Sequence, residues 1–199
     1  MEFEGDFELE AIPPEQAWLV LSDPIAVQQA LRGCKFITPM DESFAWDDFE
    51  PPTDVETLPA ADPAVVMERA FEEGQEYAAL MQVGVGSVKP RFESTVTIED
   101  RDDEDFTMVA SGGGSASDSR FDMTSGMQIE PLDGTEGSRV DWWVEADISG
   151  RIAQLGSRVI DPVADKIIGD FFGEIESQML EVEESEDSLT ERIRGRFSQ

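Results

Sequence analysis

The chain has 199 residues, with 45 Asp or Glu against 14 Lys or Arg, so its formal net charge is −31. Hydrophobic residues make up 40%, which is enough for a buried core, excludes a disordered chain and predicts one folded domain. The sequence has no His and a single cysteine, Cys34, which excludes His-dependent catalysis, His- or Cys-ligated metal centres and intrachain disulfides. We therefore expect no metal and no cofactor.

The negative charge has two interpretations. It would repel phosphate backbones and anionic membranes, which argues against nucleic acid as a partner. Alternatively, it is an adaptation to high salt, as in a halophilic organism, and the three lysines beside eleven arginines favour this reading. The N-terminus carries neither a basic nor an apolar segment, so we expect no signal peptide and a cytoplasmic protein.

The first 38 residues predict a strand, two short helices and a second strand. The first strand alternates apolar and acidic residues, and Asp23 and Pro24 suit the N-cap and first residue of the second helix. These elements span residues 2–10, 15–21, 24–32 and 34–38.

Residues 39–73 form an acidic, proline-rich and aperiodic insertion, which predicts a loop with one helix over residues 63–73. Its aromatic residues Phe44, Trp46 and Phe49 either pack the loop onto the body, which we favour, or form a docking site for a partner.

Five further strands follow, and turn residues separate them. They span residues 77–88, 91–99, 105–111, 120–129 and 139–149, giving seven antiparallel strands in all. Gly112, Gly113 and Gly114 fall in a predicted break between strands, and they also suit a place where one backbone passes close to another. The acidic residues 100–105 lack the Gly and Glu positions of a calcium loop and predict a solvated turn.

One long helix is predicted over residues 151–182, since apolar residues recur every three or four positions. Pro162 predicts a kink or restart within it. Residues 1–182 are therefore assigned to a single domain, and residues 183–199 to a charged tail. The element order is that of a curved antiparallel sheet around a helix, with a cavity between them.

Apolar residues of the strands and of the helix would face each other across this cavity. They form either ordinary core or, because methionine adapts to irregular shapes, the lining of a lipid or quinone pocket. The strand residues are Phe92, Val96, Met123, Met127, Trp142, Val144 and Ile148, and the helix residues are Leu155, Val159, Val163 and Ile167.

The segment from Gly150 to Asp161, continuing to Asp170-Phe171-Phe172, closely resembles the C-terminal signature of the CoxG family, named for an accessory protein of carbon monoxide dehydrogenase. Further matching segments are Met1–Gly5, Asp23-Pro24, Leu31–Cys34 and Gly112–Ser115, so the resemblance covers residues 1–38 and 74–182. It implies an α+β, START-like helix-grip fold of the SRPBCC superfamily.

The resemblance also implies a non-catalytic accessory protein that holds a quinone or lipid for a molybdenum-containing carbon monoxide dehydrogenase, or helps to place that enzyme at the membrane. Arg32 stands where the family usually has Pro, and the chain ends in an acidic run and Arg-Gly-Arg-Phe-Ser-Gln instead of an apolar extension. We therefore expect a cytoplasmic protein, at most peripheral at the inner face of the membrane, without an anchor.

Two other functions stay open. The first is a polyketide cyclase or dehydratase that uses a buried carboxylate and, without His, relies on Glu, Asp, Arg or Tyr77. The second is a ligand-free adaptor that binds a partner protein through residues 39–73.

Overall fold

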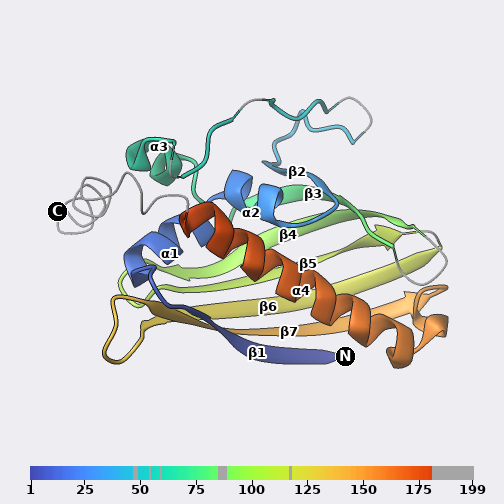
Figure 1. Cartoon of the computed structure of the whole chain (residues 1–199). Coiled ribbons are helices and arrows are strands. Elements are labelled where there is room, and N and C mark those ends of the chain that lie inside the picture. The colour runs from blue at the N-terminus through green and yellow to red at the C-terminus, as the bar shows by residue number, and fades with distance from the viewer. Residues whose placement is uncertain (47–48, 54, 59, 85–88, 117, 181–199) are drawn as a thin grey trace.

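The computed structural model is built on one antiparallel sheet of seven strands, in the order β1-β7-β6-β5-β4-β3-β2 (Figure 1). It describes residues 1–46, 49–53, 55–58, 60–84, 89–116 and 118–180. The strands are β1 (Glu2–Leu9), β2 (Cys34–Pro39), β3 (Glu76–Gln82), β4 (Arg91–Asp102), β5 (Thr107–Ala116), β6 (Ser119–Pro131) and β7 (Ser138–Gly150). The seven predicted strands are confirmed, although their ends differ. The strand predicted over residues 77–88 ends at Gln82, and residues 85–88 of that prediction lie outside the described residues.

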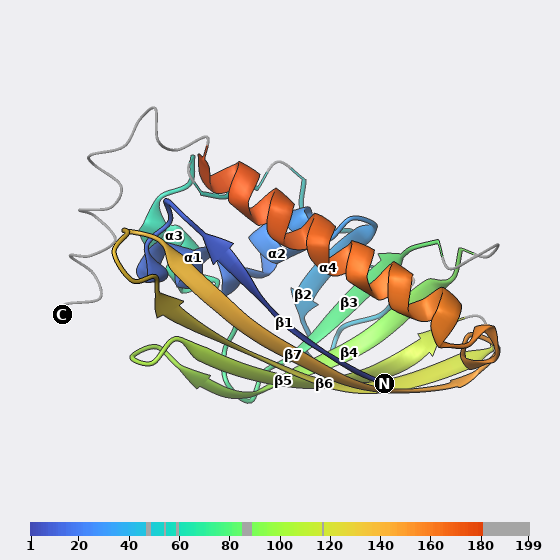
Figure 2. The same ribbon diagram turned by 60° about the horizontal axis from the view of Figure 1, so that its bottom comes forward.

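The helices lie on one face of this sheet, and the strands bend around the longest of them, α4 (Figure 2). They are α1 (Pro14–Leu21), α2 (Pro24–Ala30), α3 (Pro63–Glu68) and α4 (Ser157–Leu180), with a short 3-10 helix, η1 (Ala153–Leu155), before α4. The backbone of α4 lies closest to α2 and η1. Between these two contacts, the helix crosses the sheet without its backbone coming close to the strands.

Strand alternation decides which side chains face α4. Phe7 on β1 stacks on Phe172 of α4 with ring centroids 4.9 Å apart, and Phe7 pairs with Val140 on β7. Because side chains alternate along a strand, Trp142 and Val144 share this inner face, while Trp143 points to the outer face.

The predicted N-cap at Asp23 is confirmed. The Asp23 carboxylate accepts a hydrogen bond from the Ile25 N–H at 3.0 Å and a second, bidentate pair from the Arg69 guanidinium at 2.6 and 2.9 Å. Arg69 also donates to the Glu56 carbonyl, so the insertion is fixed to the start of α2 through one buried carboxylate.

Two predictions about the long helix are corrected. Residues 151–156 do not belong to α4, because Gly156 adopts φ 73° and separates η1 from the helix. Of the two alternatives predicted at Pro162, a kink or a restart, the restart is wrong, because α4 runs without a break from Ser157 to Leu180. Pro162 lies in the second turn and removes one backbone donor, a loss that the rest of a 24-residue helix tolerates.

The three glycines at residues 112–114 lie inside β5, so the predicted strand break at this position is wrong. The close approach is real, because a Cβ on Gly112 would lie 2.7 Å from the Thr95 carbonyl oxygen and one on Gly114 would overlap the Glu93 carbonyl. The chain turns a few residues later, where Asp118 adopts φ 63°.

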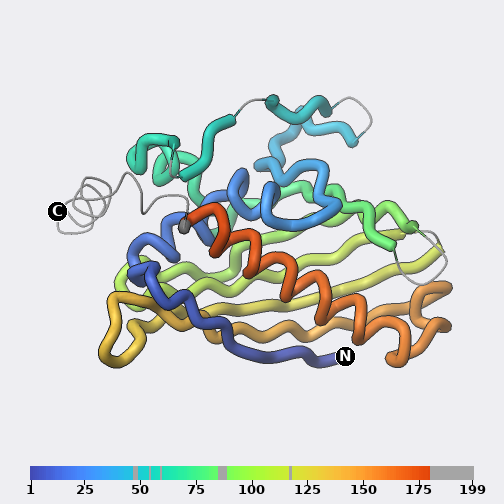
Figure 3. Tube along the Cα trace, viewed as in Figure 1, coloured from blue at the N-terminus to red at the C-terminus, as the bar shows by residue number. Residues whose placement is uncertain are grey.

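The insertion follows the edge of the sheet beside β2 (Figure 3). Its aromatic residues pack around the buried Phe36 of β2, with ring centroids 4.6 Å away for Phe49, 6.1 Å for Trp46 and 6.4 Å for Phe44. This arrangement matches the favoured interpretation, in which the loop packs onto the body. The helix α3 ends at Glu68, five residues earlier than predicted. The predicted tail, residues 183–199, lies outside the described residues.

The core forms three clusters of buried residues, and two of them lie toward the two ends of the sheet. At one end, α1 and the C-terminal half of α4 bury Trp18, Phe172, Ile175 and Met179 with the ends of β6 and β7. At the other end, a smaller cluster forms around Ile152 and Ile160. A third cluster, Phe71, Tyr77 and Ile98, packs against Val27, Met108 and Ala110 between them.

Candidate functional site

A cavity of about 230 Å³ lies between the inner face of the sheet and α4, beside α2. Its lining comes from the end of α1, from α2, β5, β6, β7 and α4, and from the segment before β3. The lining residues are Leu21, Val27, Leu31, Phe71, Met108, Ala110, Ser125, Gly126, Met127, Trp142, Trp143, Val144, Ile167, Ile168, Phe171 and Phe172.

The chemistry of this lining is apolar. Of the side chains named above, none carries a titratable group, and Ser125 contributes the one hydroxyl. Such a surface binds a guest through apolar contact and shape, with few polar groups to orient it. In the part of the chain that the structure describes, no cluster of three or more Cys, Asp or Glu side chains could hold a metal ion.

The structure places four of the ten predicted cavity residues in this lining: Met127, Trp142, Val144 and Ile167. The other six are Phe92, Val96, Met123, Leu155, Val159 and Val163, and they lie outside it. Phe92 packs with Phe121 at 5.8 Å near the second core cluster, with Ile148 beside that cluster as well. The cavity is therefore shifted toward the C-terminal half of α4.

Sequence analysis missed the other lining residues, which come from α1, α2, β5, β6, β7, α4 and the segment before β3. Val27 and Leu31 form one apolar side of α2, a signal that was visible in the sequence, but only the packing of α2 beside α4 directs it into the cavity. Phe71 gave no comparable signal, because it lies in an irregular segment.

An ion cluster lies on α4 next to the lining residues. Asp170 accepts hydrogen bonds from Lys166 at 2.9 and 3.1 Å and lies 3.8 Å from Arg32, which follows α2. The hydrogen bond from Lys166 lowers the pKa of the Asp170 carboxyl. Since both cations are paired with Asp170, this cluster links α2 to α4.

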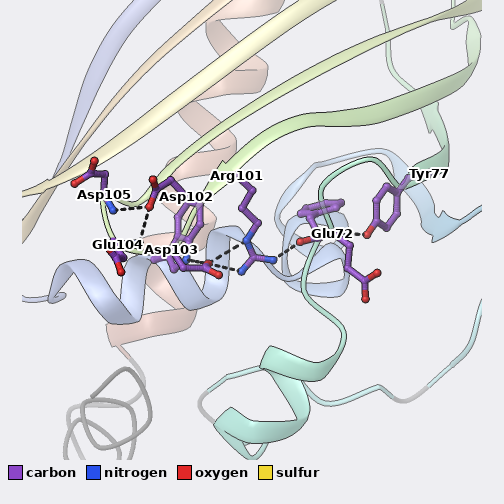
Figure 4. A network of polar contacts seen from close by, with 9 residues as sticks. Glu72, Tyr77, Arg101, Asp102, Asp103, Glu104 and Asp105 are labelled. Carbon is purple, nitrogen blue, oxygen red and sulfur yellow. Dashed lines mark hydrogen bonds and ion pairs between the residues drawn. The ribbon is translucent and has the colours of Figure 1, made fainter. Parts of the chain in front are cut away.

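Two carboxylates of the acidic turn between β4 and β5, those of Asp102 and Asp103, accept hydrogen bonds (Figure 4). Asp102 accepts the Glu104 and Asp105 N–H groups, and these hydrogen bonds lower its pKa. Asp103 accepts from Arg101 at 2.8 Å and from the Trp18 indole at 2.8 Å. The turn thus ties the end of β4 to α1.

Two further titratable groups, Tyr77 and Cys34, are buried and hydrogen-bonded to the backbone. The Tyr77 hydroxyl accepts the Glu72 N–H at 2.9 Å, and burial raises its pKa. Burial also raises the pKa of Cys34 to about 11, and its thiol donates to the Phe36 carbonyl. Neither residue lines the cavity.

The outer face of the sheet carries a second, wider hollow of about 670 Å³. Its lining is polar and includes Thr95, Thr124, Asp122 and Glu145, and it also includes the predicted cavity residue Met123. It is somewhat more open than the cavity under α4 and has a more polar lining.

The curved sheet, the covering helix and the cavity between them define a helix-grip protein, as predicted. The family model of CoxG, a carbon monoxide dehydrogenase component, matches residues 66–180. The chain belongs to the CoxG family. No curated protein matches it.

Solved structures agree on the fold. A conserved protein from Geobacillus kaustophilus is similar with a TM-score of 0.66 and 18% identity, over 91% of this chain and 96% of that one. The Zhui aromatase/cyclase from Streptomyces sp. R1128 has a TM-score of 0.54 and 12% identity, over 89% and 92%. The major latex-like protein 151 from Panax ginseng has a TM-score of 0.52 and 11% identity, over 90% and 96%.

Family and fold together support a ligand-binding or accessory role. Among the described residues, no helix combines the length and the apolar character that crossing a membrane requires.

Proposed function

We propose that this protein is a non-catalytic carrier that holds a hydrophobic small molecule, a quinone or a lipid, in the cavity under α4. The observation that carries the proposal is the cavity itself: about 230 Å³ with a lining that is apolar except for one hydroxyl. The family match supports a partner of the molybdenum-containing carbon monoxide dehydrogenase type.

The size of the cavity favours a compact guest. Pockets for drug-sized ligands have volumes of roughly 300–1,000 Å³. A cavity of about 230 Å³ would enclose a ring system or part of an acyl chain and leave a long tail outside.

The two alternative functions have less support. No carboxylate or Tyr77 lines the described cavity, so no observation favours a cyclase or dehydratase. An adaptor without a ligand would need no apolar void between the sheet and the helix. The aromatic residues of the insertion, which such an adaptor would expose, pack on Phe36 instead.

The test uses thermal unfolding and native mass spectrometry with menadione, a naphthoquinone without a tail, and with a bacterial lipid extract. A ligand at 100 times its dissociation constant stabilises the folded state by about 2.7 kcal/mol. We expect stabilisation and a bound species with at least one of these probes. If both probes leave the melting temperature unchanged and no bound species is detected, the proposal is contradicted.

A pair of variants on β6 locates the binding. Ser125→Leu places an isobutyl group in the cavity, whereas Thr124→Leu makes a similar change on the opposite face of the same strand. Ser125→Leu should remove the stabilisation by menadione or lipid, and Thr124→Leu should retain it. If the two variants lose the stabilisation by menadione or lipid equally, the guest binds elsewhere.

A further inference from the structure

One edge of β1 has no neighbouring strand among the described residues, because β1 ends the order of the sheet and pairs with β7 on its other side (Figure 1). Met1 and Ala146 exchange two backbone hydrogen bonds, of 2.6 and 2.8 Å, and the register of β1 on β7 has no shift. The backbone groups of the odd-numbered residues therefore point to β7. Those of the even-numbered residues point to the free edge: Glu2, Glu4, Asp6 and Glu8.

The side chains of β1 divide between the two faces of the sheet. The acidic ones are exposed on the outer face, and Asp6 is the one that has an ion pair within the described part of the chain, with Arg139 at 3.2 Å. Phe3 and Phe7 lie on the inner face and are only partly buried, although Phe7 stacks on Phe172. The free edge thus combines unpaired backbone groups, negative charge and incompletely covered aromatic rings, and such an edge can accept another strand.

A complementary pattern occurs in residues 192–197, which lie outside the described residues. Their sequence is Arg-Ile-Arg-Gly-Arg-Phe, whereas residues 2–8 read Glu-Phe-Glu-Gly-Asp-Phe-Glu. Both segments alternate charged and apolar residues around a central glycine, and their charges are opposite. Alternation with a period of two is typical of a strand with one polar and one apolar face. Since the chain has only 14 basic residues, three of them at alternate positions within six residues is a distinct concentration of positive charge.

We propose that residues 192–197 pair antiparallel with the free edge of β1 in the same chain and form an eighth strand of the sheet. One register satisfies the charges, and it pairs Arg192 with Glu8, Arg194 with Asp6 and Arg196 with Glu4. The same register satisfies the apolar face, with Ile193 beside Phe7, Gly195 beside Gly5 and Phe197 beside Phe3. Directly opposed residues of unlike charge stabilise an antiparallel pair. The inference goes beyond the proposed function and does not depend on it.

The end of α4 gives the added strand its direction. Met179, in the last turn of α4, and Leu9, at the end of β1, belong to the same buried cluster, so α4 ends near the end of β1. A segment that begins there and follows the free edge runs opposite to β1. Residues 181–191 lie between α4 and the segment, and when extended they span up to about 36 Å, at about 3.3 Å per residue, which is enough to turn back to the edge.

The glycines fit the same register. A Cβ on Gly5 would lie 2.9 Å from Cζ2 of Trp142, so the indole occupies the space over Gly5 on the inner face. A strand added beside β1 has least room for a side chain next to this indole, and the register places Gly195 there. A register shifted by two residues would bring Ile193 or Phe197 to this position.

Hydrogen exchange followed by NMR on the full chain tests the pairing. The eighth strand should protect the amides that point to the free edge, those of Glu4, Asp6 and Glu8. The test variant changes the three arginines of the segment to Gln: Arg192→Gln, Arg194→Gln and Arg196→Gln. The matched control changes the net charge equally at three exposed arginines elsewhere: Arg120→Gln, Arg151→Gln and Arg158→Gln.

We expect the three edge amides to exchange at least about tenfold faster in the test variant than in the unmodified chain, because a paired amide exchanges only after its hydrogen bond opens. The control should exchange like the unmodified chain. If all three chains exchange alike at these amides, the proposal is overturned, and the acidic side chains of β1 only keep the edge solvated.

A charge exchange tests the register. Glu4→Arg and Arg196→Glu should each accelerate exchange at the edge amides, and the two together should restore protection, because the ion pair is formed again with its charges reversed. The control combines Glu4→Arg with Arg192→Glu, which has the same composition but opposes like charges in this register. If the two double variants exchange at the same rate, the proposed register is wrong.

Protein concentration distinguishes pairing within one chain from pairing between two chains. Protection of the edge amides should be the same in dilute and concentrated samples, because the segment and β1 belong to one molecule. Protection that increases with concentration, together with a dimer in sedimentation, would place the segment on β1 of a second copy and contradict the proposal. Neither result would change the proposed carrier function.

Discussion

Single residues fix the parts of this protein that periodicity leaves undetermined. Asp23 is the clearest case among the residues that hold the fold together. Its side chain is fully buried and serves two elements at once, capping α2 through the Ile25 N–H and pairing with Arg69 after α3. Among the residues that face the cavity, Ser125 stands out because it carries the one hydroxyl of the lining.

Substitution of Asp23 tests this double role. Asp23→Ala removes the cap and leaves the Arg69 guanidinium without its partner, and we expect a loss of about 2–3 kcal/mol in the free energy of unfolding. Asp23→Asn keeps an oxygen that can cap α2 and removes the charge, so its loss should be smaller. Urea unfolding of both variants measures the difference, and an equal loss in the two would show that the cap contributes little.

At the scale of elements, β5 and α4 differ most from their prediction. At Gly112–Gly114 the predicted strand break was wrong, because these glycines lie inside β5. The predicted close approach of two backbones is found there, since the glycines bring β5 close to β4 and β6. The predicted helix was too long at its N-terminus because its apolar spacing continues through η1 and past Gly156. In both cases the local pattern was recognised, but the bounds of the element were wrong.

The two halves of α4 have different roles, and an identical substitution in each half tests this. Ile175 is fully buried, whereas Ile167 lines the cavity and is partly exposed. Ile175→Ala should cost about 3 kcal/mol of unfolding free energy, and Ile167→Ala only about 1 kcal/mol, because the side chain facing the cavity has fewer neighbouring atoms to lose.

Chemical denaturation of the two variants measures both values. Equal losses would mean that the cavity is closed by packing in solution, and this result would also weaken the proposed carrier function.

At the scale of the whole molecule, the net charge of −31 dominates. Self-repulsion of so many carboxylates opposes the compact state in dilute salt, and added salt screens it. We propose that the protein is adapted to high salt.

The corresponding prediction concerns the melting temperature. Between 0.1 and 2 M KCl it should rise by at least about 5 °C, which corresponds to roughly 2 kcal/mol for a chain of this size. Differential scanning calorimetry measures the change, with sorbitol of equal osmolality as the control. An increase of the same size in sorbitol would argue against charge screening, and no increase in KCl would contradict the proposal.

The element order, the seven strands and the cap at Asp23 could be predicted from the amino-acid sequence, because each depends on residue types at short spacing along the chain. The family was predicted from the resemblance of several short segments. The tertiary structure decided where the cavity lies and which side chains line it. The alternation of side chains along the strands assigns Met127, Trp142 and Val144 to the inner face. It also assigns Val96 to this face, although Val96 does not line the cavity. Whether a guest can reach them depends on how far α4 stands from the sheet and on α2 beside it. A cavity is a volume without atoms, and its position follows from the packing of elements that are distant in sequence.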